Sequence, residues 1–415
     1  MSSLVGLRCL RCGADYPPAE MFAGCPRCLR DGRPANVTSV YRYDGMPVGR
    51  EMFRGRRRSM WRYRELLPVA GEPVTLEEGG TPLVALPRLG ARWGVPDLYI
   101  KDESRNPTGS FKDRMASVIV TRAKEAGYRT VAIASSGNAG AALAAYAARA
   151  GLTCVVLTTA GAPAALVAQM QALGARLLAT RTAEDRWTLL RLGVEQLGWY
   201  AAGNYLQPPV GSNPYGVDGY KTIAFEILEA LDWKVPSAVA LPVCYGDGLW
   251  GVTKGFAEAR QLGLVERAPD LLAGEVFGPL AHALTHHLDE VRPVPAGRSV
   301  AVSIAAGIST YQALHALRTG GGAAVVVDDE ELLAVQGELG AQEGLFAEVS
   351  AVAALAALRR RAQDGDRPAG PVVAVVTATG LKDPGAAPPR SRLPVIEPTL
   401  DALRQTLREA YGMTV

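Results

Sequence analysis

A lysine at the expected start of a helix is the first residue whose position could serve chemistry. Lys112 lies in the segment NPTGSFKDR (106–114), directly after a Pro-Thr-Gly-Ser turn. The positive end of a helix dipole lowers the cost of a neutral amine, which nucleophilic and Schiff-base lysines require. Taken alone, the same lysine is also compatible with an ordinary surface residue beside Asp113.

Two further turns rich in glycine and small polar residues follow apolar, strand-like runs. The segment SSGNAG (135–140) offers hydroxyls, an amide and backbone N–H groups at a helix start, which suits an anion such as a carboxylate. The segment CYGDGLWG (244–251) places Gly246, Gly248 and Gly251 in a G-x-G-x-x-G spacing. This spacing favours a phosphate cradle over a dinucleotide site, because no acidic residue ends a second strand about 20 residues later.

Four cysteines near the N-terminus have the spacing of a metal-binding module. Cys9, Cys12, Cys25 and Cys28 form two C-x-x-C pairs. Two such pairs can present four thiolates to one tetrahedral Zn²⁺. A zinc ribbon over residues 1–34 is therefore the preferred interpretation, and a metal-free ribbon and a redox pair are the alternatives.

Apolar, strand-like runs alternate with alanine-rich helical patterns through most of the chain. The runs lie at 98–103, 131–135, 152–158, 238–243, 299–304, 323–327 and 372–377. Nearly continuous apolar strands are expected when helices cover both faces of a parallel sheet. The pattern predicts two open α/β domains, followed by a C-terminal helix over 398–411.

The composition indicates a metabolic enzyme rather than a nucleic-acid or membrane protein. The 415 residues include 44 Lys and Arg against 41 Asp and Glu, a formal charge of +3, which is too small to imply a nucleic-acid partner. We interpret the arginine-rich stretch at 50–64 as a solvated segment or subunit contact. Polar residues interrupt the longest apolar region, 131–159, so we expect no membrane span and a cytoplasmic location.

Taken together, these segments resemble the threonine synthase branch of the fold-type II pyridoxal-phosphate (PLP) enzymes. The likeness is carried by EEGGTPL at 77–83, LYIKDESRNPTGSFKDR at 98–114, SSGNAGAALAAYAA at 135–148, GYKTIAFEI at 219–227, EGLFAEVSA at 343–351 and TGLKDP at 379–384. It implies two open α/β domains of the tryptophan synthase β type behind the ribbon. The large PLP-binding domain would comprise 35–112 and 216–415, and the small domain 113–215. It also implies a homodimer that acts on a small amino acid.

The resemblance also assigns roles to individual residues. Lys112 would form the Schiff base, Phe111 would lie against the cofactor ring, Asn138 would bind the ring hydroxyl and Thr377 the pyridine nitrogen. The cofactor phosphate would be cradled by Cys244, Tyr245, Gly246, Asp247 and Gly248, and the substrate carboxylate would be held by Thr108, Ser135 and Ser136. A neutral hydroxyl at the pyridine nitrogen favours elimination over transamination.

The implied reaction converts O-phosphohomoserine and water into threonine and phosphate, and a cation must bind the distal phosphate. Threonine synthases that resemble this chain usually carry an arginine where this chain has Gly216, and Asp247 adds a negative charge to the cofactor loop. Lys221 is the predicted substitute cation. Three alternatives stay open: a paralogue performing β-elimination or β-replacement on a serine or threonine derivative, a non-catalytic binding protein, and a nucleotide-dependent oxidoreductase.

Overall fold

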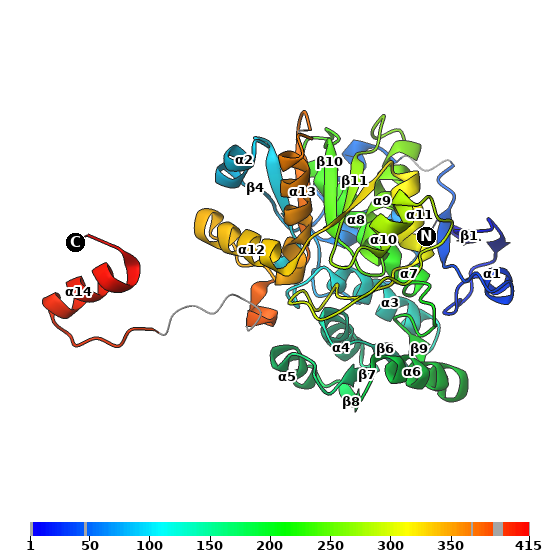
Figure 1. Cartoon of the computed structure of the whole chain (residues 1–415). Coiled ribbons are helices and arrows are strands. Elements are labelled where there is room, and N and C mark those ends of the chain that lie inside the picture. Colours follow the sequence, from blue (N-terminus) through cyan, green and yellow to red (C-terminus); the bar gives the residue numbers. More distant parts are fainter. Residues whose placement is uncertain (1–2, 45–47, 367, 385–392, 415) are drawn as a thin grey trace.

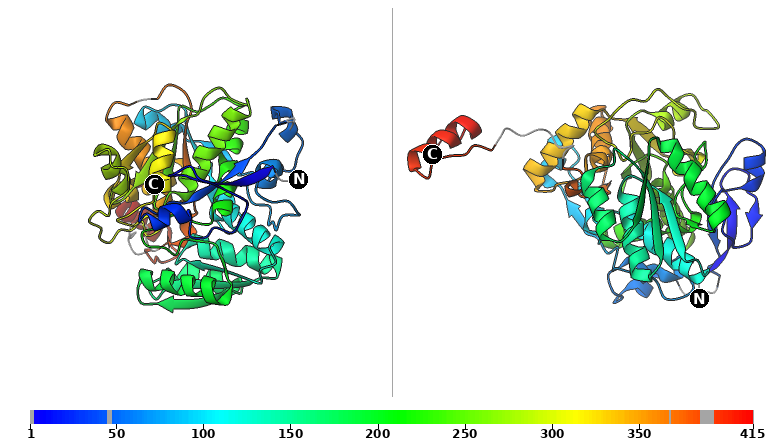
Figure 2. Two further views of the ribbon diagram at one scale, coloured as in Figure 1. Left: turned by 90° about the vertical axis from the view of Figure 1, so that its right-hand side faces the viewer. Right: turned by 90° about the horizontal axis from the view of Figure 1, so that it is seen from below.

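The fold is known from a computed structural model, which describes residues 3–44, 48–366, 368–384 and 393–414. Two α/β bodies lie one above the other, with the N-terminal module on the outer side of the upper body (Figure 1). The C-terminal helix extends away from both bodies in the same view. The views in Figure 2 show the same arrangement from two further sides.

The larger sheet has six strands, of which five run parallel. Its order is β12-β11-β10-β13-β5-β4, and only β4 pairs antiparallel with its neighbour. The strands are β4 (Leu83–Ala85), β5 (Leu98–Asp102), β10 (Ala238–Pro242), β11 (Asp270–Glu275), β12 (Ala323–Val326) and β13 (Val372–Val376). Every residue of the central strand β13 is buried, as expected for a strand covered on both faces.

The smaller sheet has four parallel strands in the order β8-β7-β6-β9. They are β6 (Thr130–Ala134), β7 (Thr153–Thr159), β8 (Arg176–Thr180) and β9 (Tyr200–Ala201). Its helices are α4 (Asn138–Ala150), α5 (Ala164–Ala172) and α6 (Ala183–Leu197). The prediction of two open α/β domains is therefore confirmed.

Helices flank the larger sheet and connect the two bodies. They are α2 (Pro87–Trp93), α3 (Lys112–Glu125), α7 (Pro214–Val217), α8 (Lys221–Ala230), α9 (Asp247–Gln261), α10 (Pro279–Thr285), α11 (Tyr311–Thr319), α12 (Asp329–Glu343) and α13 (Ala353–Gln363). Helix α14 (Leu400–Tyr411) confirms the predicted C-terminal helix. Among the described residues we find no helix whose length and apolar character would suffice for a membrane span.

The N-terminal module extends further than its cysteines suggested. Strand β1 (Leu4–Cys9) pairs with β2 (Asp15–Tyr16) on one side and with β3 (Val37–Tyr41) on the other. The short helix α1 (Pro26–Arg30) carries Cys28. The predicted boundary at residue 34 therefore omits the third strand, which only the pairing with β1 reveals.

The expectation of a strand at 299–304 was wrong. The run 299–304 alternates apolar and polar residues, but its backbone N–H groups bond to side chains: that of Val300 to Asp329 and that of Ser303 to Ser350. Conversely, β11 was not expected, because Gly274 and acidic ends interrupt its apolar pattern. A side chain at Gly274 would collide with Ala353 of α13, so helix packing explains the glycine.

Candidate active site

Lys112 is the first residue of α3, and this helix lies where the two bodies meet (Figure 1). The N–H of Phe111 donates to the Thr377 carbonyl 2.9 Å away, which ties this helix start to the end of β13. The Lys112 amine lies 4.5 Å from the centre of the Phe111 ring and 5.4 Å from that of Tyr220. Burial lowers the pKa of Lys112, and the opposing effects of Asp247, Cys244 and Glu348 only partly offset it. The site therefore favours the neutral, nucleophilic amine.

The turn before Lys112 is held by Asp113. The Thr108 hydroxyl and backbone N–H donate to the two Asp113 oxygens at 2.6 and 2.7 Å. Burial raises the pKa of Asp113 to about 7, although both hydrogen bonds act in the opposite direction. The Thr108 hydroxyl proton is therefore engaged in shaping the turn, and this geometry lends no support to its predicted contact with substrate.

A buried ionic cluster fixes the first turn of α3 behind Lys112. Arg114 is fully buried and donates two hydrogen bonds to Glu103 and two to Glu226, at 2.7–2.8 Å. Lys101 donates to the same Glu226 at 2.7 Å. Since Glu103 follows β5 and Glu226 lies in α8, the cluster joins three segments distant in sequence. None of these residues had been predicted to support the site.

The loop 244–248 has the shape expected of an anion cradle. Gly246 adopts a left-handed backbone (φ 77°) and immediately precedes α9, so the first backbone N–H groups of this helix face the loop without intrahelical partners. The Thr310 hydroxyl donates to the Tyr245 carbonyl at 2.7 Å and steadies the loop. A Cβ on Gly248 would lie 2.7 Å from the Phe111 ring, so this loop and the residue before Lys112 are in close contact.

The Asp247 carboxylate is paired with hydrogen-bond donors from outside the cradle. It accepts hydrogen bonds from the Ser212 N–H, the Ser212 hydroxyl and Gln312 at 2.6–2.9 Å. The Gln312 oxygen in turn accepts from Asn36 of the N-terminal module. Three donors and a position in the first turn of α9 thus compensate the negative charge that the sequence alone made difficult to explain.

The turn 135–138 follows β6 and faces the same site. Ser135 accepts the N–H groups of Gly137 and Gly140 and so shapes the start of α4. The Asn138 side-chain nitrogen donates to Glu348 at 2.7 Å, whereas its oxygen is buried without a hydrogen-bond partner. Ser136 contacts Arg186 instead, as described below.

Two polar residues of the site, Glu348 and Lys382, were not predicted from the sequence. Glu348 accepts from both Asn138 and Ser303. The Lys382 amine is buried and makes no hydrogen bond within the described residues; burial lowers the pKa of Lys382 to about 8, against the attraction of Asp113 and Glu348. Both lie in segments that carry the family resemblance, EGLFAEVSA and TGLKDP, which could have indicated them.

The buried atoms without partners fit a polar cofactor. The Asn138 oxygen, the Ser110 hydroxyl and the Lys382 amine are all buried and unpaired within the described residues, although native interiors rarely leave such groups unsatisfied. The helix-start cradle at 244–248 suits a phosphate, and Lys112 suits an aldehyde carbon. PLP carries both groups, together with a ring hydroxyl and a ring nitrogen.

Lys221 does not lie where the sequence interpretation needed it. Its amine is fully buried, 2.8 Å from Glu258 and 4.0 Å from Asp218, and sits 3.8 Å from the centre of the Tyr41 ring. A side chain on Gly216 would collide with Ile119 and approach Met115, both in α3. Neither position offers a free cation for the substrate, so this geometry gives the proposed role of Lys221 no support.

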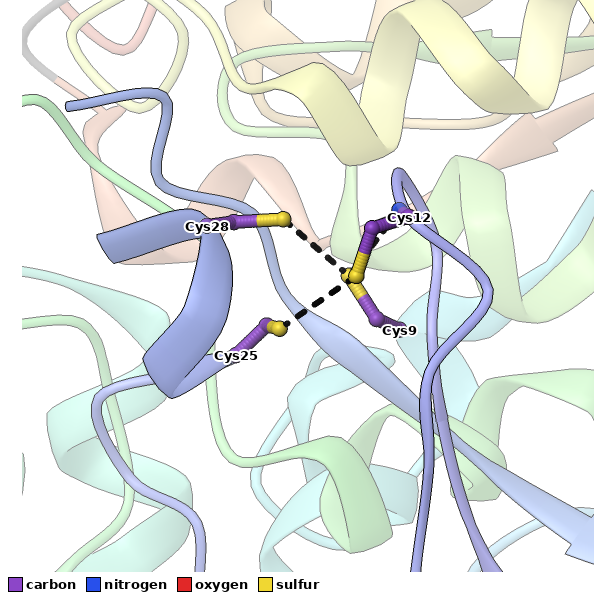
Figure 3. Close-up of side chains that lie close together, drawn as sticks. All are labelled: Cys9, Cys12, Cys25 and Cys28. Carbon is purple, nitrogen blue, oxygen red and sulfur yellow. Dashed lines mark hydrogen bonds between the residues drawn. The ribbon is translucent and has the colours of Figure 1, made fainter. Parts of the chain in front are cut away.

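The side chains of Cys9, Cys12, Cys25 and Cys28 point toward one another in the N-terminal module (Figure 3). All four sulfur atoms lie within 4.8 Å of one another, with Cys9 and Cys28 at 3.6 Å and Cys12 and Cys25 at 3.7 Å. Tetrahedral zinc with Zn–S bonds of about 2.3 Å would separate its sulfur ligands by about 3.8 Å, whereas a disulfide needs about 2.05 Å. The geometry fits a four-thiolate zinc site.

Comparison with known proteins agrees with this site. The family of pyridoxal-phosphate dependent enzymes matches residues 74–378. A threonine synthase of Methanosarcina acetivorans is 38% identical over 97% of this chain and 98% of its own length, and one of Methanocaldococcus jannaschii is 35% identical over 97% and 99%. Two solved structures share the fold. A threonine deaminase of Solanum lycopersicum has a TM-score of 0.62 and 19% identity, and the match covers 72% of this chain and 79% of that one. A maize serine racemase has a TM-score of 0.62 and 21% identity, and the match covers 72% of this chain and 88% of that one. The chain belongs to the PLP-dependent enzymes of fold-type II and, within them, to the threonine synthase family.

Proposed function

We propose that this chain is a threonine synthase, which converts O-phosphohomoserine and water into threonine and inorganic phosphate. The observation that carries the proposal is the position of Lys112: an amine of lowered pKa at the start of α3, against Phe111 and close to the cradle at 244–248. Threonine synthases matching nearly the whole chain support the choice of reaction.

Each residue has a defined task in this proposal. When bound, PLP supplies an electron sink for the substrate carbons. Lys112 would hold the cofactor and, once free, would move protons at Cα and Cβ of the substrate, so that phosphate would leave from Cγ and water would add at Cβ. Asn138 would bind the ring hydroxyl, and Thr377 would offer its hydroxyl to the ring nitrogen. Backbone N–H groups at the start of α9 bind the cofactor phosphate.

We further infer that Cys9, Cys12, Cys25 and Cys28 hold a structural zinc ion, on the support of their sulfur geometry. All four thiolates would bind the metal, which leaves no open position for catalysis. The domain boundaries, with the module extended through β3, the homodimer and the cytoplasmic location stay predictions. Light scattering on the purified protein tests the dimer.

A second function is favoured by one observation. The position that carries arginine in related threonine synthases is Gly216, packed against α3, and Lys221 is paired with Glu258. A paralogue performing β-elimination or β-replacement on O-phosphoserine would need its cation at a different place, because the phosphate of this substrate is one carbon closer to Cα. The test compares O-phosphohomoserine and O-phosphoserine at equal concentration, with assays of released phosphate and of the amino-acid product. Threonine from the first substrate supports the proposal, and turnover of the second alone would replace it with the paralogue.

A further inference from the structure

A phosphate-ester substrate needs a cation at its distal end, and the smaller body offers one. Arg186 lies in the first turn of α6, in the smaller body. One of its terminal nitrogens, Nη1, donates to the Ser136 hydroxyl oxygen at 2.9 Å, and Nε donates to the Ala183 carbonyl at 3.4 Å. A guanidinium group carries five N–H donors, so an edge is available for a further acceptor.

The surroundings of Arg186 form a small polar cluster at the carboxyl edge of the smaller sheet. The Ser136 hydroxyl oxygen lies 3.0 Å from the Thr159 hydroxyl, 3.2 Å from the Thr158 hydroxyl and 3.2 Å from the Thr159 N–H. Ser136 follows β6, and both threonines end β7. Ligands bind at this edge in open parallel sheets.

Helix α6 also reaches the cofactor loop of the larger body. The ring of Trp187, next to Arg186, meets the ring of Tyr245 edge-on at 6.1 Å. Helix α6 therefore contacts the turn that precedes Asn138 through Arg186 and the loop 244–248 through Trp187. Ser136, which Arg186 contacts, lies in the same turn as Asn138, a residue predicted to hold the cofactor.

The charge of Arg186 is not neutralised by the chain. Within the parts of the chain that the structure describes, no carboxylate lies within 4 Å of its guanidinium group, and the residue is half-buried. Burial lowers the pKa of Arg186, with Tyr245 and Glu184 acting in the opposite direction. Partial desolvation without an ion pair is unfavourable and would be relieved by an anionic ligand.

We propose that Arg186 binds the phosphate group of the substrate and thereby determines specificity for a phosphate ester. This inference rests on the proposed function and names the residue that takes over from the missing arginine at position 216. A planar guanidinium group can bind two phosphate oxygens at once, which a lysine cannot.

The test compares Arg186→Gln and Arg186→Lys with Arg191→Gln, which changes an exposed arginine on the same helix. Holoenzyme is titrated in a calorimeter with inorganic phosphate and with L-threonine, which has a carboxylate but no phosphate. KM and kcat for O-phosphohomoserine are measured in parallel. The loss of a charge-assisted hydrogen-bonded pair predicts that Arg186→Gln weakens phosphate binding and raises KM by about 10- to 100-fold.

We expect L-threonine to bind Arg186→Gln within about twofold of wild type, Arg186→Lys to recover part of the loss, and Arg191→Gln to match wild type. Equal weakening of L-threonine and phosphate would overturn the proposal, because Arg186 would then serve the carboxylate or the structure. Unchanged phosphate binding would overturn it as well. If wild type binds phosphate but does not turn over O-phosphohomoserine, the proposed function fails while the role of Arg186 is still decided by the calorimetry.

Discussion

The contact between Gly248 and Phe111 allows a direct test of how the cofactor loop and Lys112 depend on each other. In Gly248→Ala, the new Cβ would lie 2.7 Å from Cε2 of Phe111. Carbon atoms normally pack at about 3.5–4.0 Å, so the ring or the loop must move by about 1 Å. Overpacking of this kind costs about 1–3 kcal/mol. If the cofactor site bears that cost, PLP binding weakens by about 5- to 150-fold.

The assay titrates apoprotein with PLP and follows the visible absorbance, with urea unfolding as a measure of stability. Gly337→Ala is the matched control, because Gly337 is an exposed helical glycine with open space around its Cβ position. The free energy of unfolding of Gly337→Ala should increase by about 0.5–1 kcal/mol, and this control should bind PLP as wild type does. The double variant Phe111→Leu with Gly248→Ala should recover part of the PLP affinity lost in Gly248→Ala, because leucine is smaller than phenylalanine. Wild-type PLP affinity and stability in Gly248→Ala would refute the steric argument.

Three further predictions concern stability and metal. Arg114→Met leaves two carboxylates buried without their partner and should lower the free energy of unfolding by about 3–5 kcal/mol. By contrast, Arg54→Ala removes an ion pair with Glu51 that is exposed on both sides, and it should change the free energy of unfolding by less than about 1 kcal/mol. Urea titration checks both variants. Burial raises the pKa of Glu275 from 4.5 to about 7. Its favourable contribution to the free energy of unfolding is therefore complete below pH 4.5 and is lost as the pH rises through 7. The free energy of unfolding of Glu275→Gln, measured relative to wild type, should therefore increase by about 2 kcal/mol between pH 5.5 and 8.5. A relative free energy of unfolding that does not change over this pH range would contradict the assigned burial effect. Cys28→Ser should lose the stoichiometric zinc that a metal-indicator assay finds in wild type and in Cys154→Ala, and zinc retained by Cys28→Ser would exclude the four-thiolate site.

The sequence predicts those parts of this protein that depend on local pattern. Apolar runs predict β5, β10, β12 and β13 of the larger sheet and β6 and β7 of the smaller one, but not β4, β8, β9 or β11. The turn before Lys112 predicts the nucleophile, because this signal also lies within a few consecutive residues. The run at 299–304 shows the limit of this reasoning. It has a strand pattern, but the carboxylate of Asp329 and the hydroxyl of Ser350 bind its backbone instead of a neighbouring strand.

The rest of the site depends on contacts between distant segments. Glu348 meets Asn138 although 210 positions separate them, and Arg186 meets Ser136 across 50 positions. No local pattern distinguishes Arg186 from the other arginines of the chain. For Lys221, the local motif suggested a contact with substrate, but the fold pairs this residue with Glu258. Departures from the family pattern, such as Gly216, became interpretable only through their neighbours in α3.

The most direct test of the central claim is the visible spectrum of the purified wild type and of Lys112→Ala, each then incubated with O-phosphohomoserine while phosphate and threonine are assayed. We predict that wild type carries the absorbance of bound PLP and releases both products in equal amounts, and that Lys112→Ala lacks that absorbance and releases neither. A colourless wild type that PLP cannot reconstitute, or a Lys112→Ala variant that turns over at the wild-type rate, would contradict the assignment of Lys112 as the cofactor-binding residue.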